Sequence, residues 1–292
     1  MWRVVLGVLA ALPLTAQPTA SELLEAKVLE EIRQFDRGFD GALGMAAIDL
    51  TSGRAFAWHG DTAFPTASMI KIPILVRMFQ EERAGRFHFT DRITLNPREA
   101  VGGSGRLQFQ LKNGPVTLTV RELIAAMIEH SDNTATNKCI DMVGMDGVNQ
   151  MLDRMGFPQT RLRRKMMDSA AAQRGDENVS TPVEMARLVE QIYRGKAVDE
   201  RASREILEIM KTVQGDFQAG LPLDVEAASK TGELPGARCQ TGVVYLPGRP
   251  FALSVMSAFI DDRRTPVPEV MRLVFAYFEK LAASNRYGNR LR

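Results

Sequence analysis

The sequence predicts an α+β fold: an antiparallel sheet flanked by N- and C-terminal helices, with an all-helical lobe inserted between its strands. Three observations predict it. Strand-like segments near the beginning, a long helical middle and a return of strand-like segments occupy residues 44–58, 66–214 and 226–259 in turn. Because strands at opposite ends of the chain can pair only if those ends meet, we expect one sheet built from both ends and a separate helical lobe.

The elements at the two ends follow from residue spacing and turn residues. Apolar residues recur at helical spacing over residues 21–35, and a final helix is expected over residues 268–283. Thr51-Ser52-Gly53 separates two strand-like segments, residues 44–50 and 54–58, which predicts a β-hairpin. The later strands are expected at residues 226–230, 242–246 and 251–259.

The helical middle contains two helix-start signals. Thr119 followed by Glu122, and Thr181 followed by Glu184, both match the capping-box pattern. We therefore predict that residues 66–214 form the helical lobe. Both chain ends, residues 17–65 and 215–292, are expected to form the α/β lobe, and the two lobes to act as one functional domain.

The N-terminus has the layout of a secretory signal peptide. Arg3 precedes an uncharged, mostly apolar stretch over residues 4–14, which is too short for a normal transmembrane helix. We expect a signal peptide over residues 1–16, cleavage after Ala16 and export to the periplasm or the medium, without stable membrane insertion. An uncleaved anchor is the alternative.

Composition narrows the function classes. The chain has 292 residues, 45% of them apolar, and a net charge of +2, which argues against a nucleic-acid or membrane-surface role. Two short basic clusters, residues 161–165 and 285–292, are interpreted as a solvated loop and tail. We expect a monomer.

The cysteine count points away from redox and metal chemistry. Cys139 and Cys239 are the only cysteines, and we expect two free thiols, with a disulfide between them as the alternative. No His/Cys cluster has the spacing of metal ligands, so neither a metal nor a cofactor is expected.

Three short motifs occur in a fixed order along the chain: Ser68-Met69-Ile70-Lys71, Ser131-Asp132-Asn133 and Lys230-Thr231-Gly232. Together they are typical of sites where a serine is acylated by a β-lactam or an acyl-D-alanyl peptide. The first is expected at a helix start near the lobe junction, the second on a loop of the helical lobe and the third on the sheet. Three elements would thus surround one cleft.

Serine chemistry explains these residue types. A serine hydroxyl is a weak nucleophile until a neighbour takes its proton, and helical spacing places Lys71 beside Ser68. Since an ammonium group cannot accept a proton, Lys71 must lose its charge through burial near Lys230 or relay through a partner. Ser131 is the natural relay to the leaving nitrogen, and Lys230 supplies positive charge for a substrate carboxylate.

The remaining groups fit substrate binding. Asn133 offers an amide to a substrate carbonyl, and the backbone N–H groups of Ser68 and Glu233 are expected to form the oxyanion hole. The histidines fit no Ser/His/Asp arrangement; they are His59, His88 and His130.

On these motifs, and on the segment 119–137 that leads into Ser131-Asp132-Asn133, the chain resembles the class A β-lactamases and their penicillin-binding relatives over about residues 21–284. The resemblance implies the β-lactamase/transpeptidase fold and a serine hydrolase without metal or cofactor. It implies that Ser68 carries the acyl group and that Lys71 and Ser131 move protons. Lys230 and Thr231 would hold the substrate carboxylate, with Gly232 also in the substrate-binding set.

One element departs from the family pattern. Class A enzymes carry a loop Glu that activates the deacylating water, followed by an Asn; here Met166 and Ala170 fall at those places. A thioether cannot take a proton from water, and losing a general base costs about 10²–10⁴-fold in the step it serves. The expectation is acylation with impaired deacylation.

Substitutes for the missing groups can be named. Asp168 is the nearest candidate base and Glu177 a more distant one, while the plain alternative for Asp168 is an ion pair with Arg163 or Arg164. Thr241 stands where some class A enzymes have a carboxylate-binding Arg, and Arg238 is a possible replacement.

The sequence therefore favours an exported serine hydrolase that is acylated at Ser68 by β-lactams and opens the β-lactam amide. A penicillin-binding-type peptidase or transpeptidase acting on peptidoglycan stem peptides is the alternative. A binder or sensor that does not turn over is a second alternative.

Overall fold

The computed structural model describes residues 19–261 and 264–291. The predicted signal peptide and its cleavage after Ala16 lie outside these residues. In the part of the chain that is described, no helix has both the length and the apolar character needed to cross a bilayer.

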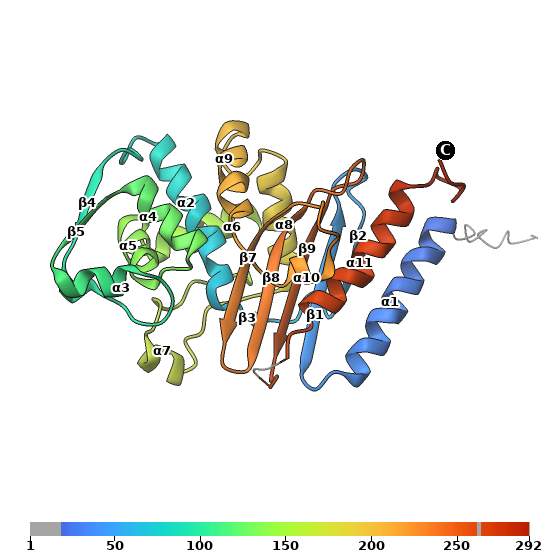
Figure 1. The fold of residues 1–292 in the computed structure, drawn as a ribbon, viewed down its shortest axis with the longest axis horizontal. Helices are drawn as coiled ribbons and strands as arrows, with labels where there is room; N and C mark the ends of the chain where they lie inside the picture. Colours follow the sequence, from blue (N-terminus) through green and yellow to red (C-terminus); the bar gives the residue numbers. More distant parts are fainter. Residues whose placement is uncertain (1–18, 262–263, 292) are drawn as a thin grey trace, which may run out of the picture.

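A five-stranded antiparallel sheet forms the centre of the fold and is built from both ends of the chain (Figure 1). Its strands, in spatial order, are β2 (Ala55–Trp58), β1 (Ala42–Asp49), β9 (Phe251–Ala258), β8 (Ala237–Val244) and β7 (Ala227–Leu234). Strands β1 and β2 form the predicted hairpin. The α+β fold class is confirmed, and β7 is an edge strand.

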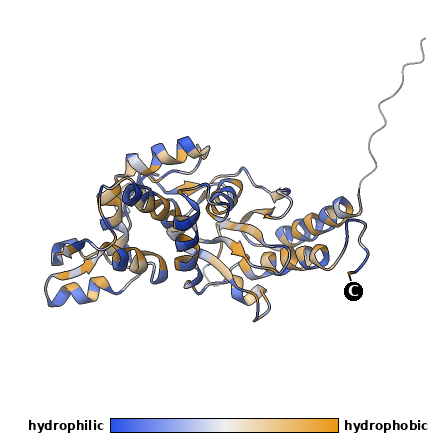
Figure 2. Ribbon diagram, turned by 90° about the horizontal axis from the view of Figure 1, so that it is seen from above, coloured by the Kyte–Doolittle hydropathy of each residue, from blue (hydrophilic) through white to orange (hydrophobic). Residues whose placement is uncertain are grey.

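The sheet is buried on both faces because alternate side chains of each strand point to opposite sides. On β1, Leu43 and Met45 belong to a core shared with the terminal helices α1 (Ala20–Gly38) and α11 (Val267–Ala282). Ala46 and Ile48, on the opposite face of the strand, belong to the core of the helical side. The helices in Figure 2 likewise carry both hydrophobic and hydrophilic residues along their length.

The other elements lie between β2 and β7 in the sequence, and most of them are on the other side of the sheet from α1 and α11 (Figure 1). The short helix α10 (Phe217–Gly220) is the exception, because it packs against α11. The helices are α2 (Lys71–Arg83), α3 (Leu107–Gln110), α4 (Val120–Glu129), α5 (Asn133–Val143), α6 (Met145–Met155), α7 (Ser169–Gln173), α8 (Pro182–Tyr193), α9 (Glu200–Lys211) and α10 (Phe217–Gly220). Short 3₁₀ helices are η1 (Ala67–Ile70), η2 (Pro97–Glu99) and η3 (Leu111–Asn113). Helix α8 packs directly on β1, β8 and β9.

The prediction of an almost entirely helical middle is wrong in two places. Strands β4 (Arg92–Leu95) and β5 (Val116–Thr119) form an antiparallel pair, with the hydroxyls of Thr94 and Thr117 2.9 Å apart. Strands β3 (Phe64–Pro65) and β6 (Val179–Ser180) form another. These strands are two to four residues long, and each exists because a distant segment pairs with it.

The two predicted capping boxes have different outcomes. At Thr119 the box is complete, since the Thr119 hydroxyl and the Glu122 carboxylate bond reciprocally to backbone N–H groups. At Thr181 only one half of the box forms, in which the Thr181 hydroxyl accepts the Glu184 N–H at 3.2 Å. The Glu184 carboxylate instead accepts the N–H groups of Gln159 and Thr160, and Thr160 is buried, so its N–H group needs a partner within the protein.

Phe278 of α11 should be an anchor of the terminal-helix core. It is fully buried and stacks on Phe251 of β9, with ring centroids 4.3 Å apart. Phe278→Ala should lower the free energy of unfolding by about 3–5 kcal/mol, because it removes an aromatic side chain from a packed core. Chemical denaturation measures this. Leu223→Ala, at an exposed position, is the control and should change stability by less than about 0.5 kcal/mol; equal effects of the two variants would contradict the packing described.

Candidate active site

Ser68 lies in η1, the 3₁₀ turn that leads into α2. Met69 and Ile70, the next two residues of the turn, are fully buried and anchor it in the core. Ala67, directly before the serine, has a left-handed backbone with φ of 45°, a conformation that costs free energy for a residue with a Cβ atom. Ser68 itself lines an open cavity of about 700 Å³.

Strand β7 lies tightly against this turn. A Cβ atom on Gly232 would be 2.4 Å from the Thr66 carbonyl oxygen and 2.5 Å from Cys239 Sγ, so only glycine allows the approach. The Lys230-Thr231-Gly232 motif therefore sits within β7 and beside Ser68, not at the end of a shorter strand ending at residue 230 as the sequence predicted.

Cys139 and Cys239 are both free, as expected, and both are buried.

Lys71 is the most constrained group of the site. Its side chain is fully buried, and its Nζ donates to the Ser131 carbonyl at 2.7 Å, Ser131 Oγ at 2.9 Å and Asn133 Oδ1 at 3.2 Å. Burial, and next the charge of Lys230, hold the pKa of Lys71 well below its usual range; Asp132 and Cys139 act weakly in the opposite direction.

Lys230 is buried as well but keeps its proton more readily. Burial lowers its pKa to about 8, against an opposing contribution from Cys239, and its Nζ donates to the Thr231 carbonyl at 3.2 Å. With a pKa of about 8, Lys230 is mostly an ammonium near pH 7. Burial and the charge of Lys230 favour the neutral form of Lys71.

The Ser131-Asp132-Asn133 motif is held by a glycine-rich loop. Ser131 has a left-handed backbone with φ of 51°, and the Asp132 carboxylate accepts the N–H groups of Leu107 and Ala135, each at 2.9 Å. A Cβ atom on Gly105 would lie 2.1 Å from Asp132 Oδ2. The Asn133 amide donates to the Gly102 carbonyl at 2.9 Å, which aims its oxygen at Lys71.

Residues 161–178, which we call the Met166 loop, bring Met166 to the other side of the cavity. Arg164 and Glu177 close the loop with two parallel N–H···O bonds of 3.0 Å. The Asn137 side chain then clamps the Met166 backbone, accepting its N–H at 2.8 Å and donating to its carbonyl at 3.1 Å. The Met166 side chain, 8% exposed, lines the cavity.

Asp168 is not brought to this cavity. Its Oδ1 accepts the Ala171 N–H at 2.9 Å and caps the first turn of α7, while Ser169 and Ala172 line the cavity instead. Neither predicted ion pair of Asp168 forms, because Glu177 takes Arg164 and the Asp168 carboxylate is used for the cap.

The predicted carboxylate-binding side is arranged around β7 and β8. Thr231, Gly232, Glu233 and Arg238 line a second, smaller cavity of about 270 Å³, and Glu233 and Arg238 also line the larger one. Arg238 Nη2 lies 2.8 Å from Glu233 Oε1. Thr241 is fully buried, with its Oγ1 3.1 Å from Met69 Sδ and 2.8 Å from Ser254 Oγ, so of the two residues it is Arg238 that faces the cavities.

Sequence reasoning missed several site residues. Met167 and Gly103 line the larger cavity, and Asn137 positions the Met166 backbone. The run Gly102-Gly103-Ser104-Gly105 was the available signal, since clustered glycines often permit close backbone approach.

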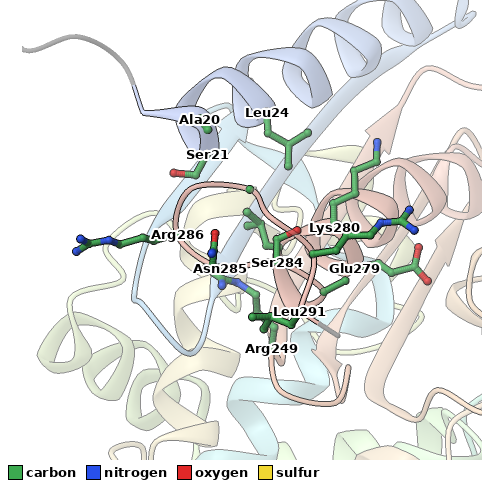
Figure 3. A pocket seen from close by; sticks show the side chains of 14 residues that line it. Ala20, Ser21, Leu24, Arg249, Glu279, Lys280, Ser284, Asn285, Arg286 and Leu291 are labelled. Carbon is green, nitrogen blue, oxygen red and sulfur yellow. The ribbon is translucent and has the colours of Figure 1, made fainter.

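A larger hollow, of about 1040 Å³, lies between the beginning of α1 and the segment after α11 (Figure 3). Its labelled lining includes Leu24, Lys280, Ser284 and Arg286. None of the motif residues lines it, so the chemistry is assigned to the cavity of about 700 Å³ that Ser68 lines.

Comparison with known proteins agrees with this geometry. Residues 27–271 match the model of the β-lactamase enzyme family. A β-lactamase of Streptomyces fradiae is 31% identical over 295 residues, which cover 95% of this chain and 93% of that protein.

Solved structures also match. The structure of PBP-A is 28% identical with a TM-score of 0.79, covering 87% of this chain and 96% of that one. A leucine-to-glutamate variant of PBP-A, described as an acyl-enzyme complex with penicillin G, is 28% identical with a TM-score of 0.80, and the match covers 87% of this chain and 97% of that one. An ancestral class A β-lactamase of Gram-negative bacteria is 27% identical with a TM-score of 0.79, and the match covers 86% of this chain and 100% of that one. The chain therefore belongs to the β-lactamase enzyme family and is a serine hydrolase of the class A β-lactamase-like type.

Proposed function

We propose that this protein is acylated at Ser68 by β-lactams, opens their amide bond and releases the acyl group slowly. The observation that carries the proposal is the contrast between the two sides of the cavity. On one side lies a buried amine, Lys71, in hydrogen-bond contact with Ser131. On the other lies a thioether, Met166, which cannot activate water.

Acylation follows from the arrangement of these groups. The neutral Lys71 amine takes the Ser68 proton as Oγ attacks the lactam carbonyl carbon and the new C–O bond forms. Lys71 then passes a proton through Ser131 Oγ to the lactam nitrogen as the C–N bond breaks. The N–H groups of Ser68 and Glu233 stabilise the oxyanion, which suits β7 because an edge strand leaves alternate N–H groups unpaired.

Substrate binding uses the smaller cavity and the charge of Lys230. Thr231 and Lys230 hold the substrate carboxylate, with Gly232 keeping the strand close to the serine and Asn133 contacting a substrate carbonyl. Arg238 lies at the junction of the two cavities and adds positive charge at the carboxylate side.

For release of the acyl group, the described residues of the cavity provide no group comparable to the Lys71 amine that serves acylation. Among the described residues that line the larger cavity, Glu233 alone carries a carboxylate, and it is paired with Arg238. Asp168 is used as a helix cap. Hydrolysis of the ester must therefore proceed without a general base in direct contact with the attacking water, and the acyl-enzyme should persist.

A penicillin-binding-type peptidase is the second candidate, favoured by Met166 and by the similarity to PBP-A. It would use the same acylation steps on an acyl-D-Ala-D-Ala peptide, expelling D-Ala and passing the acyl group to water or to an amine. We also propose that the protein is exported and acts as a monomer on small molecules or cell-wall peptides.

The first prediction is a stoichiometric burst. A chromogenic cephalosporin should give about one equivalent of fast product followed by slow steady-state turnover, and mass spectrometry should find the adduct on Ser68. Ser68→Ala should abolish both, while Ser169→Ala, which removes a hydroxyl from the same cavity, should abolish neither. Fast sustained turnover would contradict slow release, and absence of an adduct would contradict acylation.

The second prediction is the pH dependence of acylation. Since Lys230 must be charged, and its pKa is about 8, the second-order rate constant of acylation should fall as the pH rises through about 8. At low pH the rate should also fall, because Lys71 becomes protonated. Stopped-flow measurements across pH test this. Lys230→Arg keeps its charge at high pH and should shift the alkaline decline upward; an unchanged alkaline limb would argue against Lys230.

The third prediction concerns deacylation. Met166→Glu places a carboxylate on a backbone already clamped by Asn137, and should speed loss of the penicilloyl adduct by about 10²–10⁴-fold with little change in acylation. Met166→Gln has nearly the same shape but no base. Equal acceleration by the two variants would show that size, not proton transfer, limits release.

A further inference from the structure

The large hollow between the beginning of α1 and the segment after α11 has an excess of positive charge. Lys280, Arg286 and Arg290 line it, and Glu279 is the one carboxylate among its described lining residues. A fourth basic residue of the lining, Arg249, is paired with a buried aspartate at 2.7 Å. No carboxylate in the described part of the chain forms an ion pair with Lys280, Arg286 or Arg290, so these charges are open to an external anion.

The segment after α11 is folded into a defined turn. Ser284 and Arg290 form an antiparallel bridge, and the Leu291 N–H donates to the Ala283 carbonyl at 2.8 Å. Within the turn, the side-chain oxygen of Asn285 accepts two backbone N–H groups, at 3.0 and 3.1 Å. The basic cluster that the sequence suggested to be a solvated tail is therefore held in place beside the hollow.

Apolar surface lies next to these charges. Leu24, Leu281 and Leu291 line the same hollow, Leu24 from α1 and Leu291 from the turn (Figure 3). Leu291 is 63% exposed and Tyr287 is 68% exposed. The Arg286 guanidinium lies over the Tyr287 ring, 4.6 Å from its centroid. Side chains that combine an apolar body with a polar or charged tip are suited to the boundary between an apolar phase and water.

We propose that the hollow and the turn at residues 284–291, together called the basic pole, form a docking surface for a membrane that contains anionic phospholipids. The lipid phosphates lie against Lys280, Arg286 and Arg290, and the acyl chains meet Leu24 and Leu291. A soluble anion would use the charges but not the exposed apolar side chains, whereas a lipid surface uses both. This inference does not depend on acylation of Ser68.

The place of the basic pole in the chain agrees with a membrane partner. Helix α1 begins at Ala20, so the apolar stretch over residues 4–14, which we expect to act in export, joins the described chain at this end. The net charge of +2 argues against a membrane-surface role for the chain as a whole, but a surface meets the local charge, and the structure gathers three basic residues here. The cavity of Ser68 stays open, because α1 and α11 cover the other side of the sheet from α2 and α5 (Figure 1).

The test is sedimentation of the protein, purified after export, with vesicles of phosphatidylcholine alone or of phosphatidylcholine mixed with phosphatidylglycerol. Wild-type protein should bind the anionic vesicles more strongly, and this preference should weaken as the salt concentration rises. The triple variant Lys280→Gln, Arg286→Gln, Arg290→Gln should lower the partition coefficient on anionic vesicles about 100-fold, since each basic residue near such a surface contributes about fivefold.

A second triple variant is the matched control. Lys196→Gln, Arg201→Gln, Arg204→Gln removes the same charge from exposed positions on and before α9 that line no part of the hollow, and should leave the partition coefficient nearly unchanged. Thermal unfolding shows that both variants are folded. Equal losses in the two variants, or equal binding of wild-type protein to the two kinds of vesicle, would overturn the inference. Release of the protein from anionic vesicles by soluble glycerol phosphate would overturn it as well, because the pole would then recognise a free phosphate and not a membrane.

Discussion

The burial of two lysines in one small site is the constraint on which the rest of the structure depends. Lys71 has no exposed surface and Lys230 has almost none, and burying two neighbouring ammonium groups is costly. Oxygens of Ser131 and Asn133 accept hydrogen bonds from Lys71, while burial and the charge of Lys230 lower the pKa of Lys71 further than burial lowers that of Lys230. The bent backbones at Ala67 and Ser131, and the glycines at 105 and 232, all serve to bring these groups within reach of one another.

Much of the fold and of the candidate site was predictable from the sequence, because the site residues occur in short motifs whose order and spacing can be recognised without the structure. The order of the three motifs places a serine and a lysine on one turn, a serine on a loop and a lysine on a strand, and the structure brings Lys71, Ser131 and Asn133 into contact. The split of strands between the chain ends likewise predicted one sheet. These signals are local, or depend only on which segments are strand-like.

What could not be predicted depends on partners that only the folded chain supplies. Glu184 fits a capping box, but its carboxylate accepts the N–H groups of residues 159 and 160 from a distant loop. Asp168 looked available as a base, yet the turn into α7 uses it as a cap. Strands β4 and β5 are too short to be recognised without each other. The place of Met167 on the cavity wall gives no sequence signal either, because it depends on a left-handed backbone, with φ of 62°, and on contact with the distant Gly103.

The clamp of Asn137 on residue 166 engages main-chain atoms only. The path of that loop is therefore independent of which side chain stands at this position, and the groups that attach an acyl chain are independent of both. Under the proposed function, the fold separates capture of the acyl group from the lifetime of the acyl-enzyme, and the lifetime depends on one exchangeable side chain, that of residue 166. A lineage could move between an enzyme that clears a drug and one that retains a cell-wall intermediate without rebuilding the scaffold that both require.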